Sequence, residues 1–588
     1  MTTATRRSLT DVPDILYNVF SHFDVHAVWY NDNRSAALYD SRRSLAMAAR
    51  TCRAFTDPAL KMLWSSLPDD QPLSDLLCTL GIATRERDLD YQSRHDEDKP
   101  QRYRLPPTDD VGGYPDFDAT DAYERRWKRA RGYDVNYSIS TPGDPRTHAH
   151  WDRFVEYASR VRAVALFIFD GPKWSRLWDE LQSAAGGITI LPMLYTVTFC
   201  EIGPRRALTP GIFALLPPSV GKLRLPLPPS RLDSSVVRKY FPHIRHMDVQ
   251  PECGVEDLRM LAGFPTLRWL SISLSFGIPS PNLALPALPV LGTLAMEGSW
   301  TDLTTLLNSA HLPSLHTLSV AGWEGEDNAS KLAMDVKQCF HAISRYKSIT
   351  NLSIYTTYTP QHQYGCVEDD IPEVHGTFDG DLLDTMRPLL SLRSLRYLAT
   401  RLPDYLVGTE SDLSLMADAW PDLVELHLII WVYQGWSRAY IPRPERPYGG
   451  RLEGIAHFAG KCPRLRVLHL PAMEIAEESL GAVEFPSETH DLQTLVIEKV
   501  LFPYGRADLA GQISELVRRV FPRVASAFEQ DQIRFGKEEF YFSEDDDPDP
   551  GEEEGKEEEQ ETWGFVRGAS GRFDDCTKHM WLRWRVAW

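Results

Sequence analysis

Cysteine, histidine and serine are the residue types that a catalytic or metal-binding centre in this sequence would need. No two of the eight cysteines lie within five residues of each other, so the paired spacing of zinc sites is absent. The tightest histidine pair is His148 and His150. The sequence also lacks a Walker loop, a G-x-G-x-x-G motif and a G-x-S-x-G motif. We therefore predict that the chain is not an enzyme and holds no metal or cofactor, because an active site needs a converging set of such groups.

Length and composition limit what the rest of the molecule can be. The chain has 588 residues, of which 43% are hydrophobic and 11% aromatic, enough for several domains or one long repeat array. No run of about 18 apolar residues is present, so we expect no membrane span. The N-terminus lacks the apolar segment of a secretion signal, and the cysteines are dispersed. These features predict an intracellular protein of the cytoplasm, the nucleus or both.

The charge of the chain is unevenly distributed. The net charge is -19, and the stretch Glu544–Glu561 holds 12 acidic residues and one lysine. A negatively charged body repels phosphate backbones, so we expect no nucleic-acid partner. The acidic stretch is most simply a solvated, disordered loop, and docking of a basic partner on it is the less favoured alternative.

One short phrase recurs along the centre of the chain and is followed by helical patterns. It has the form L-x-x-L-x-L, often after a proline, as in "FPTLRWLSI" and "LPSLHTLSV". Five consecutive gaps between copies measure 23–26 residues, a period typical of leucine-rich repeats. One such unit cannot bury its own apolar face, so neighbours must stack into a curved solenoid. The twelve copies begin at Val161, Leu194, Val220, Ile244, Leu267, Leu291, Leu315, Ile349, Leu395, Leu423, Leu465 and Leu492.

Three short amphipathic helices are predicted before the repeats, within residues 8–67. Pro13 suits the first turn of the first helix, and we expect Pro58 to separate the second helix from the third. So small a unit has a marginal core and often packs on a partner or a neighbouring domain. The apolar positions at helical spacing are Ile15, Leu16, Val19, Phe20 and Phe23, then Leu45, Ala48, Cys52 and Phe55, then Ala59, Met62, Leu63, Trp64 and Leu67.

The remaining segments complete the predicted organisation. Residues 68–150 are charged and broken by proline and glycine, which is typical of a linker or insert. Residues 151–523 hold the repeats. In the C-terminal region, 524–588, the segments "QIRFGKEEFYF" and "WGFVRGASGRF" flank the disordered acidic loop 544–561, and we expect them to pair as a hairpin. The final "MWLRWRVAW" is expected to cap the open end of the array.

The N-terminal residues resemble an F-box. The carriers of the resemblance are "LTDVPDILYNVFSHFD", with its "VFSHF" end, and "SLAMAARTCRAFTDPALKMLW", with "TCRAF" and the closing Pro58 to Trp64. Joined to repeats in this order, they resemble the fungal F-box proteins with leucine-rich repeats, and "HWDRFVEYASRVRAVAL" is similar to that family's entry into its first repeat. The stretch between Phe23 and Leu45 is longer than the family pattern. It either loops out without effect or disturbs docking.

This resemblance implies a substrate receptor. The F-box would bind the Skp-type adaptor of a cullin–RING ubiquitin ligase, the repeats would hold a protein substrate, and the ligase partners would catalyse ubiquitin transfer. The residues that the resemblance assigns to adaptor binding are Pro13, Ile15, Leu16, Val19, Phe20, Leu45, Ala48, Cys52, Phe55, Leu63 and Trp64. We expect Leu45, Cys52 and Trp64 to belong partly to the core of the module itself.

Substrate contacts are expected from the open face of the repeats, at strand positions between the core leucines. A wide face of mixed chemistry favours a protein over a small ligand. Strand candidates are Trp269, Ser271, Ser273, Thr317, Ser319, Asn351, Ser353, Tyr355, Glu425 and His427. The long loop Ile430–Gly450 adds Trp431, Tyr433, Trp436 and Arg438, which are of the types enriched at binding hot spots. Packing of these rings against the solenoid is an equally favoured alternative.

Together these patterns predict an α/β chain, with an N-terminal three-helix F-box followed by a curved leucine-rich-repeat solenoid and a partly disordered acidic C-terminal region. The predicted function is substrate recognition for a Skp–cullin–F-box ubiquitin ligase. The alternative is a repeat scaffold for protein interactions that is not coupled to ubiquitination. The long segment before Leu45 keeps this alternative open.

Overall fold

The computed structural model divides into two compact units, Met1–Arg268 and Trp269–Trp588. The residues that it describes are 13–23, 32–69, 71–87, 135–140, 144–168, 177–181, 183, 189–201, 216–225, 238–276, 287–323, 329–357, 382–403, 410–431, 450–474, 490–502, 515, 517, 519–524 and 564–567.

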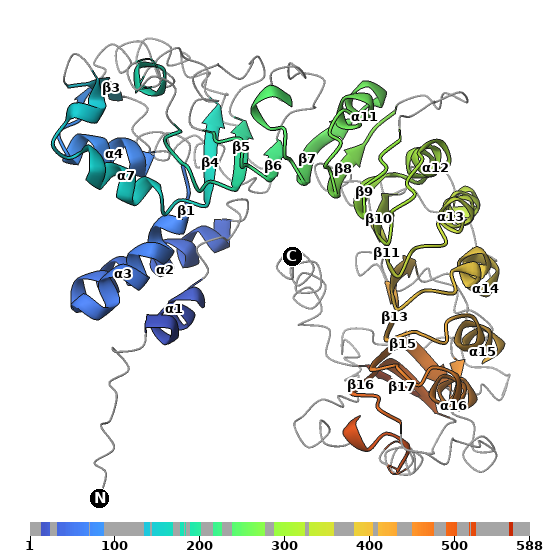
Figure 1. Ribbon diagram of the computed structural model, residues 1–588. Helices are drawn as coiled ribbons and strands as arrows, with labels where there is room; N and C mark the ends of the chain where they lie inside the picture. Colours follow the sequence, from blue (N-terminus) through green and yellow to red (C-terminus); the bar gives the residue numbers. More distant parts are fainter. Residues whose placement is uncertain are drawn as a thin grey trace, which may run out of the picture. The chain divides into compact units, whose positions relative to one another are not determined.

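The first unit combines N-terminal helices with a parallel sheet (Figure 1). The N-terminal elements are α1 (Pro13–Ser21), α2 (Asp32–Thr51), α3 (Arg53–Ser65), β1 (Ser66–Leu67) and α4 (Gln71–Thr79). An antiparallel pair, β2 (Ala83–Arg87) and β3 (Val135–Ile139), is followed by η2 (Pro145–Thr147) and α7 (Trp151–Ala158). The parallel sheet has the order β1, β4 (Ala163–Ile168), β5 (Thr196–Glu201), β6 (Lys222–Leu225) and β7 (His246–Cys253), and α11 (Val255–Leu261) follows.

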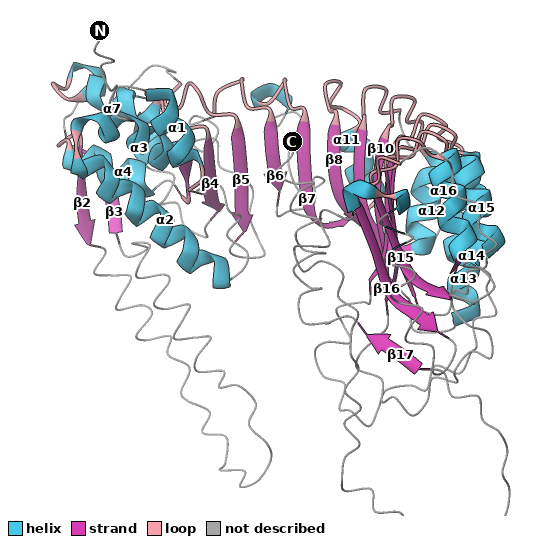
Figure 2. Ribbon diagram, turned by 90° about the horizontal axis from the view of Figure 1, so that it is seen from below, coloured by secondary structure: helices cyan, strands magenta, loops and turns pink. Residues whose placement is uncertain are grey.

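In the second unit, one long sheet carries helices along one side (Figure 2). Its order is β8 (Trp269–Leu274), β9 (Thr293–Ser299), β10 (Thr317–Trp323), β11 (Asn351–Thr357), β12 (Tyr397–Pro403), β13 (Glu425–Trp431), β15 (Val467–Glu474), β16 (Thr494–Phe502) and β17 (Gly564–Arg567). The strands are parallel up to β16, and β14 (Gly450–Arg451) also pairs with β15. The helical elements are α12 (Trp300–Ser309), α13 (Ala329–Ile343), α14 (Leu382–Met386), η6 (Arg387–Ser391), α15 (Glu410–Ala419) and α16 (Leu452–Lys461).

The repeat phrase predicts the core of both units. All twelve first positions of the phrase, from Val161 to Leu492, are at most 1% exposed. The second leucine of the phrase pairs in register from strand to strand, so these side chains form one continuous buried row. Each buried leucine contributes about 1.5–3 kcal/mol relative to an exposed one. In the second unit this row comprises Leu294, Leu318, Leu352, Leu398, Leu426 and Leu468.

A backbone ladder fixes the register of neighbouring repeats just before each strand. The Tyr195 carbonyl accepts hydrogen bonds from two successive N–H groups of the next repeat, both at 3.0 Å. The Gly292 carbonyl does the same, at 2.9 and 3.0 Å. Hydroxyl groups add a second link, because Thr266 donates to the Ile244 carbonyl at 2.7 Å and Ser348 to that of Leu315 at 2.6 Å. Buried turn carbonyls are thereby satisfied between repeats.

The structure differs from the sequence predictions at several element boundaries. The second helix begins at Asp32, well before the apolar residues that predicted it. It ends at Thr51, and Cys52 is extended, so the break lies six residues before Pro58, which is inside α3. The Thr56 hydroxyl donates a hydrogen bond to the Ala49 carbonyl at 2.9 Å, which pairs one of the backbone carbonyls in the last turn of α2.

The segments outside the repeats also form elements that composition did not reveal. Residues 68–150 were predicted as linker and insert, yet they contain α4, β2 and β3. At the C-terminus, "WGFVRGASGRF" supplies β17, which pairs antiparallel with β16. The segments 532–542 and 580–588 lie outside the described residues.

Candidate functional site

The three N-terminal helices enclose a small core of their own. Leu16, Phe20, Leu45, Ala59 and Met62 are each at most 6% exposed and pack together. The Phe20 and Phe55 rings meet edge to face, with centroids 5.6 Å apart. Side chains packed on this core are partly buried, among them Ala48, Phe55 and Leu63. The module therefore folds around residues that sequence analysis assigned to adaptor binding.

The burial pattern divides the predicted adaptor-binding residues into two groups, and their role in docking stays a prediction. Leu16, Phe20 and Leu45 are at most 6% exposed and face the interior of the module. Cys52, expected to be partly core, is exposed at the break between α2 and α3. A helix of nine residues can bury only one stripe, and in α1 that stripe contains Leu16 and Phe20.

Exposed apolar side chains remain on the same helices. Ile15 and Val19 are 44% and 47% exposed and lie one helical turn apart on α1. Met47 of α2 is 61% exposed, although sequence analysis did not select it. Sequence analysis missed Met47 because it lies outside the helically spaced set Leu45, Ala48, Cys52 and Phe55. Pro13 begins α1, and its side chain lies outside the description.

Backbone pairing joins the helical module to the first repeat. Strand β1 directly follows α3 and pairs in parallel with β4. The Arg162 N–H donates to the Ser65 carbonyl at 2.8 Å, and the Arg42 guanidinium donates to the Ser66 carbonyl at 2.6 Å. Burial lowers the pKa of Arg42. Trp64, a predicted docking residue, contacts Tyr157 of α7 with the two rings tilted and their centroids 5.1 Å apart.

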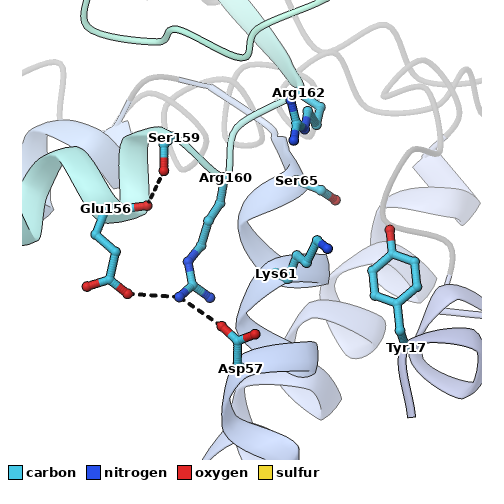
Figure 3. A pocket seen from close by; sticks show the side chains of 8 residues that line it. All are labelled: Tyr17, Asp57, Lys61, Ser65, Glu156, Ser159, Arg160 and Arg162. Carbon is cyan, nitrogen blue, oxygen red and sulfur yellow. Dashed lines mark hydrogen bonds and ion pairs between the residues drawn. The ribbon is translucent and has the colours of Figure 1, made fainter. Parts of the chain in front are cut away.

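A polar cleft of about 280 Å³ lies at this joint (Figure 3). Arg160 bridges two carboxylates, at 2.9 Å from Asp57 of α3 and 2.9 Å from Glu156 of α7. The Lys61 ammonium lies 4.7 Å from the centre of the Tyr17 ring. The remaining lining residues are Ser65, Ser159 and Arg162.

The cleft has no activated nucleophile among its lining residues. The Ser65 hydroxyl donates to the Met62 carbonyl and the Ser159 hydroxyl to the Glu156 carbonyl, both at 2.7 Å. No histidine lines the cleft to serve as their base. The cleft lies where α3 and α7 meet, and the ion pairs of Arg160 link the two helices across it.

The open face of the second unit brings the predicted strand candidates into register. One row holds Thr317, Asn351 and Glu425, together with Trp269 of β8. The second row holds Ser271, Ser319, Ser353 and His427. The third row holds Ser273 and Tyr355.

Two of these candidates are poorly placed for contact with a partner. Thr317 is 4% and Ser353 6% exposed, because neighbouring side chains cover them. Burial also raises the pKa of Tyr355. Sequence analysis could not predict the burial of Thr317 and Ser353, because it depends on which side chains lie next to each other in adjacent strands.

An aromatic and imidazole cluster in the same rows was only partly predicted. The His427 ring lies 5.8 Å from the ring of Tyr397 and 5.9 Å from that of His469, and its Nε2 is 3.6 Å from a Glu425 oxygen. Tyr397 lies in the row of Glu425 and His469 in the row of His427, within the phrases that begin at Leu395 and Leu465. Extending the candidate positions to every repeat would have found them.

The loop candidates cannot be placed. Tyr433, Trp436 and Arg438, like the side chain of Trp431, lie outside the described residues.

Among the residues that the structure describes, no group of three or more His, Cys, Asp and Glu side chains could hold a metal. The rings of His148 and His150 lie 5.7 Å apart. Burial raises the pKa of the thiols of Cys253, Cys339 and Cys462 to about 12. No described helix is long and apolar enough to cross a bilayer.

Comparisons with known proteins add little to this description. No protein-family model and no curated protein sequence match the chain. Among solved structures, it is similar to an internalin from Listeria monocytogenes, at 13% identity and a TM-score of 0.30, over 60% of this chain and 78% of the internalin. A Bacteroides fragilis protein shows 12% identity and a TM-score of 0.22, over 64% and 84%. Such scores carry no argument, so the repeat architecture rests on this chain's own spacing and register.

Proposed function

We propose that the chain is a non-catalytic receptor of the cytoplasm or nucleus. Its repeats hold a protein substrate, and its N-terminal helices dock on the Skp-type adaptor of a cullin–RING ubiquitin ligase. The ligase partners supply the catalysis. Neither a metal nor a cofactor is required for this role.

The observation that carries the proposal is the exposed apolar pair on α1. Ile15 and Val19 leave nearly half of each side chain in water, although Leu16 and Phe20 of the same helix are buried. Burying two such side chains on a partner is favourable at about 25 cal/mol per Å² of apolar surface. The module is also anchored to the first repeat through β1, so a partner docked on α1 is held at a fixed position relative to that repeat.

The open face of the second unit supports protein binding by the repeats. Its rows present hydroxyl, amide, imidazole and carboxylate groups along strands β8 to β13. A broad surface of mixed chemistry suits a protein better than a small molecule, which is usually enclosed in a concave apolar pocket.

A scaffold without ubiquitination is the second candidate, and two observations favour it. Leu16, Phe20 and Leu45 are core residues, so the adaptor-binding set implied by the resemblance is reduced. Helix α2 spans twenty residues from Asp32, which departs from the compact family pattern.

Binding of purified adaptor to the full chain separates the two candidates. We expect the wild type to co-elute with the adaptor and the Ile15→Asp/Val19→Asp variant to lose binding at least tenfold. Asn18→Asp is the matched control, because it places a negative charge on an exposed position of the same helix. Failure of the wild type to bind, or equal binding by the double variant, would favour the scaffold.

A further inference from the structure

The open face of strands β8 to β11 carries one charged side chain among its described positions. This face points away from the helices of the second unit (Figure 2). It is formed by alternate residues of each strand, which in β9 are Thr293, Ala295, Glu297 and Ser299. The equivalent positions of β8, β10 and β11 are all uncharged. Glu297 is therefore an isolated negative charge on a neutral part of the sheet.

Strand register places Glu297 beside two aromatic residues. Ala321 of β10 pairs with Glu297 of β9 on one side and with Tyr355 of β11 on the other. Adjacent strands lie about 4.8 Å apart, so the carboxylate and the phenol flank the alanine methyl group. Trp323 lies two residues after Ala321 in β10 and thus on the same face. Glu297, Ala321, Trp323 and Tyr355 are called the acidic–aromatic patch below.

The longer side chains of the patch remain accessible. Ala321 is 9% exposed, because the side chains around it extend beyond its methyl group. Glu297 is exposed, and Trp323 and Tyr355 are half-buried. The patch therefore offers a partner one carboxylate and parts of two aromatic rings.

The Glu297 carboxylate is not neutralised by a neighbouring cation. Burial alone raises its pKa, and no positive charge among the described residues contributes to lower it. Its partners across the strands, Ser273 and Ala321, are uncharged. Arg401 of β12 lies in the same row, but three strand spacings away, about 14 Å.

This environment favours a cationic ligand for two physical reasons. A partly desolvated carboxylate attracts a positive charge more strongly than a fully hydrated one does. The faces of tryptophan and tyrosine rings also attract ammonium and guanidinium groups. Glu425 on the same face differs, because His427 Nε2 lies 3.6 Å from its carboxylate.

We propose that the acidic–aromatic patch binds a lysine or arginine side chain of a partner protein. The cationic group contacts the Glu297 carboxylate, and the Trp323 and Tyr355 rings pack against it and its aliphatic stem. This inference rests on the proposed role of the repeats in partner binding, and it assigns one side chain that the partner presents. Charge complementarity selects this occupant.

Fluorescence anisotropy with the full chain tests the proposal. The probe is a labelled ten-residue peptide of alternating Lys and Ser, compared with a Gln/Ser peptide of equal length. The test variants are Glu297→Gln, which removes the charge and keeps the size, and Trp323→Leu, which removes the indole. The matched control is Glu425→Gln, because it removes the same charge from another strand of the same face.

We expect the Lys/Ser peptide to bind the wild type, with weaker binding at high salt. Glu297→Gln should weaken this binding about fivefold and Trp323→Leu about threefold, whereas Glu425→Gln should change it less than twofold. Equal losses in Glu297→Gln and Glu425→Gln would assign the binding to the overall charge of -19 and overturn the proposal. Equal binding of the Gln/Ser peptide would also overturn it.

Carbodiimide cross-linking followed by mass spectrometry identifies the occupant directly, because it joins a carboxylate to an amine in contact with it. An amide bond between Glu297 and a lysine of the added peptide supports the proposal. Cross-links from Glu297 only to lysines of the chain itself would contradict a partner.

Failure of this inference is distinguishable from failure of the receptor proposal. If the Lys/Ser peptide does not bind but the full chain still binds the adaptor, the patch inference fails and the receptor proposal stands. If the adaptor does not bind but peptide binding still depends on Glu297, the patch inference stands and the scaffold is favoured.

Discussion

Replacing Leu45 by alanine tests whether the N-terminal helices fold around their own core. Leu45 is completely buried among Leu16, Phe20, Ala59 and Met62. The substitution removes the isopropyl group of Leu45 from the centre of this cluster, and few other side chains among the described residues of the three helices are buried and could compensate.

The expected cost is about 3 kcal/mol, within the range of about 2–5 kcal/mol for leucine-to-alanine changes in cores. This is a large fraction of the stability of any small module. Met47→Ala is the matched control, because Met47 lies on the same helix and is 61% exposed. The control should change the free energy of opening by less than about 0.5 kcal/mol.

Hydrogen exchange read by mass spectrometry resolves the effect along the chain. For Leu45→Ala we expect faster exchange in α1, α2 and α3, with no change in the strands β9 to β12. Unchanged exchange in Leu45→Ala, or an equal effect of Met47→Ala, would refute the assignment of Leu45 to the interior. It would then restore Leu45 as a docking residue.

Two further predictions concern the repeats and the thiols. Gly322→Ala should destabilise the second unit by about 1–3 kcal/mol, because the new Cβ would stand 2.2 Å from the buried Trp300 ring; unchanged denaturant unfolding would contradict this packing. Iodoacetamide at pH 8 should label Cys52 and spare Cys339, whose pKa burial raises to about 12. The neutral Cys339 thiol stabilises the fold below about pH 9, and this stability should be lost as pH rises toward 12, which denaturation at several pH values would detect.

The sequence predicted the repeat core well because the phrase records burial directly. A buried strand needs apolar residues at alternate positions, and the preceding turn needs another, so Leu267, Leu270 and Ile272 reveal one repeat by themselves. All three are at most 3% exposed. Helix α12 was likewise predicted from Leu303, Leu306 and Leu307, which are buried.

The site was less predictable, because it depends on how separate elements pack. Periodicity identifies an apolar stripe, but it does not tell whether the stripe faces the module's own core or a partner. Leu16 and Val19 are both apolar residues of α1, yet only packing against α2 and α3 separates the buried one from the exposed one.

Removing residues 1–67 is a poor test of function, because β1 is part of the sheet and pairs with β4. Surface variants of the full chain avoid this difficulty. The exposed pair on α1 offers such a variant, with Asn18→Asp again as the matched control.

Affinity capture from proteasome-inhibited cells, with the wild type and the Ile15→Asp/Val19→Asp variant, tests the receptor proposal most directly. We predict that the variant loses the adaptor and the cullin while it retains a second set of proteins, the substrate candidates. The same captured proteins for wild type and variant, without adaptor or cullin in either, would contradict the account.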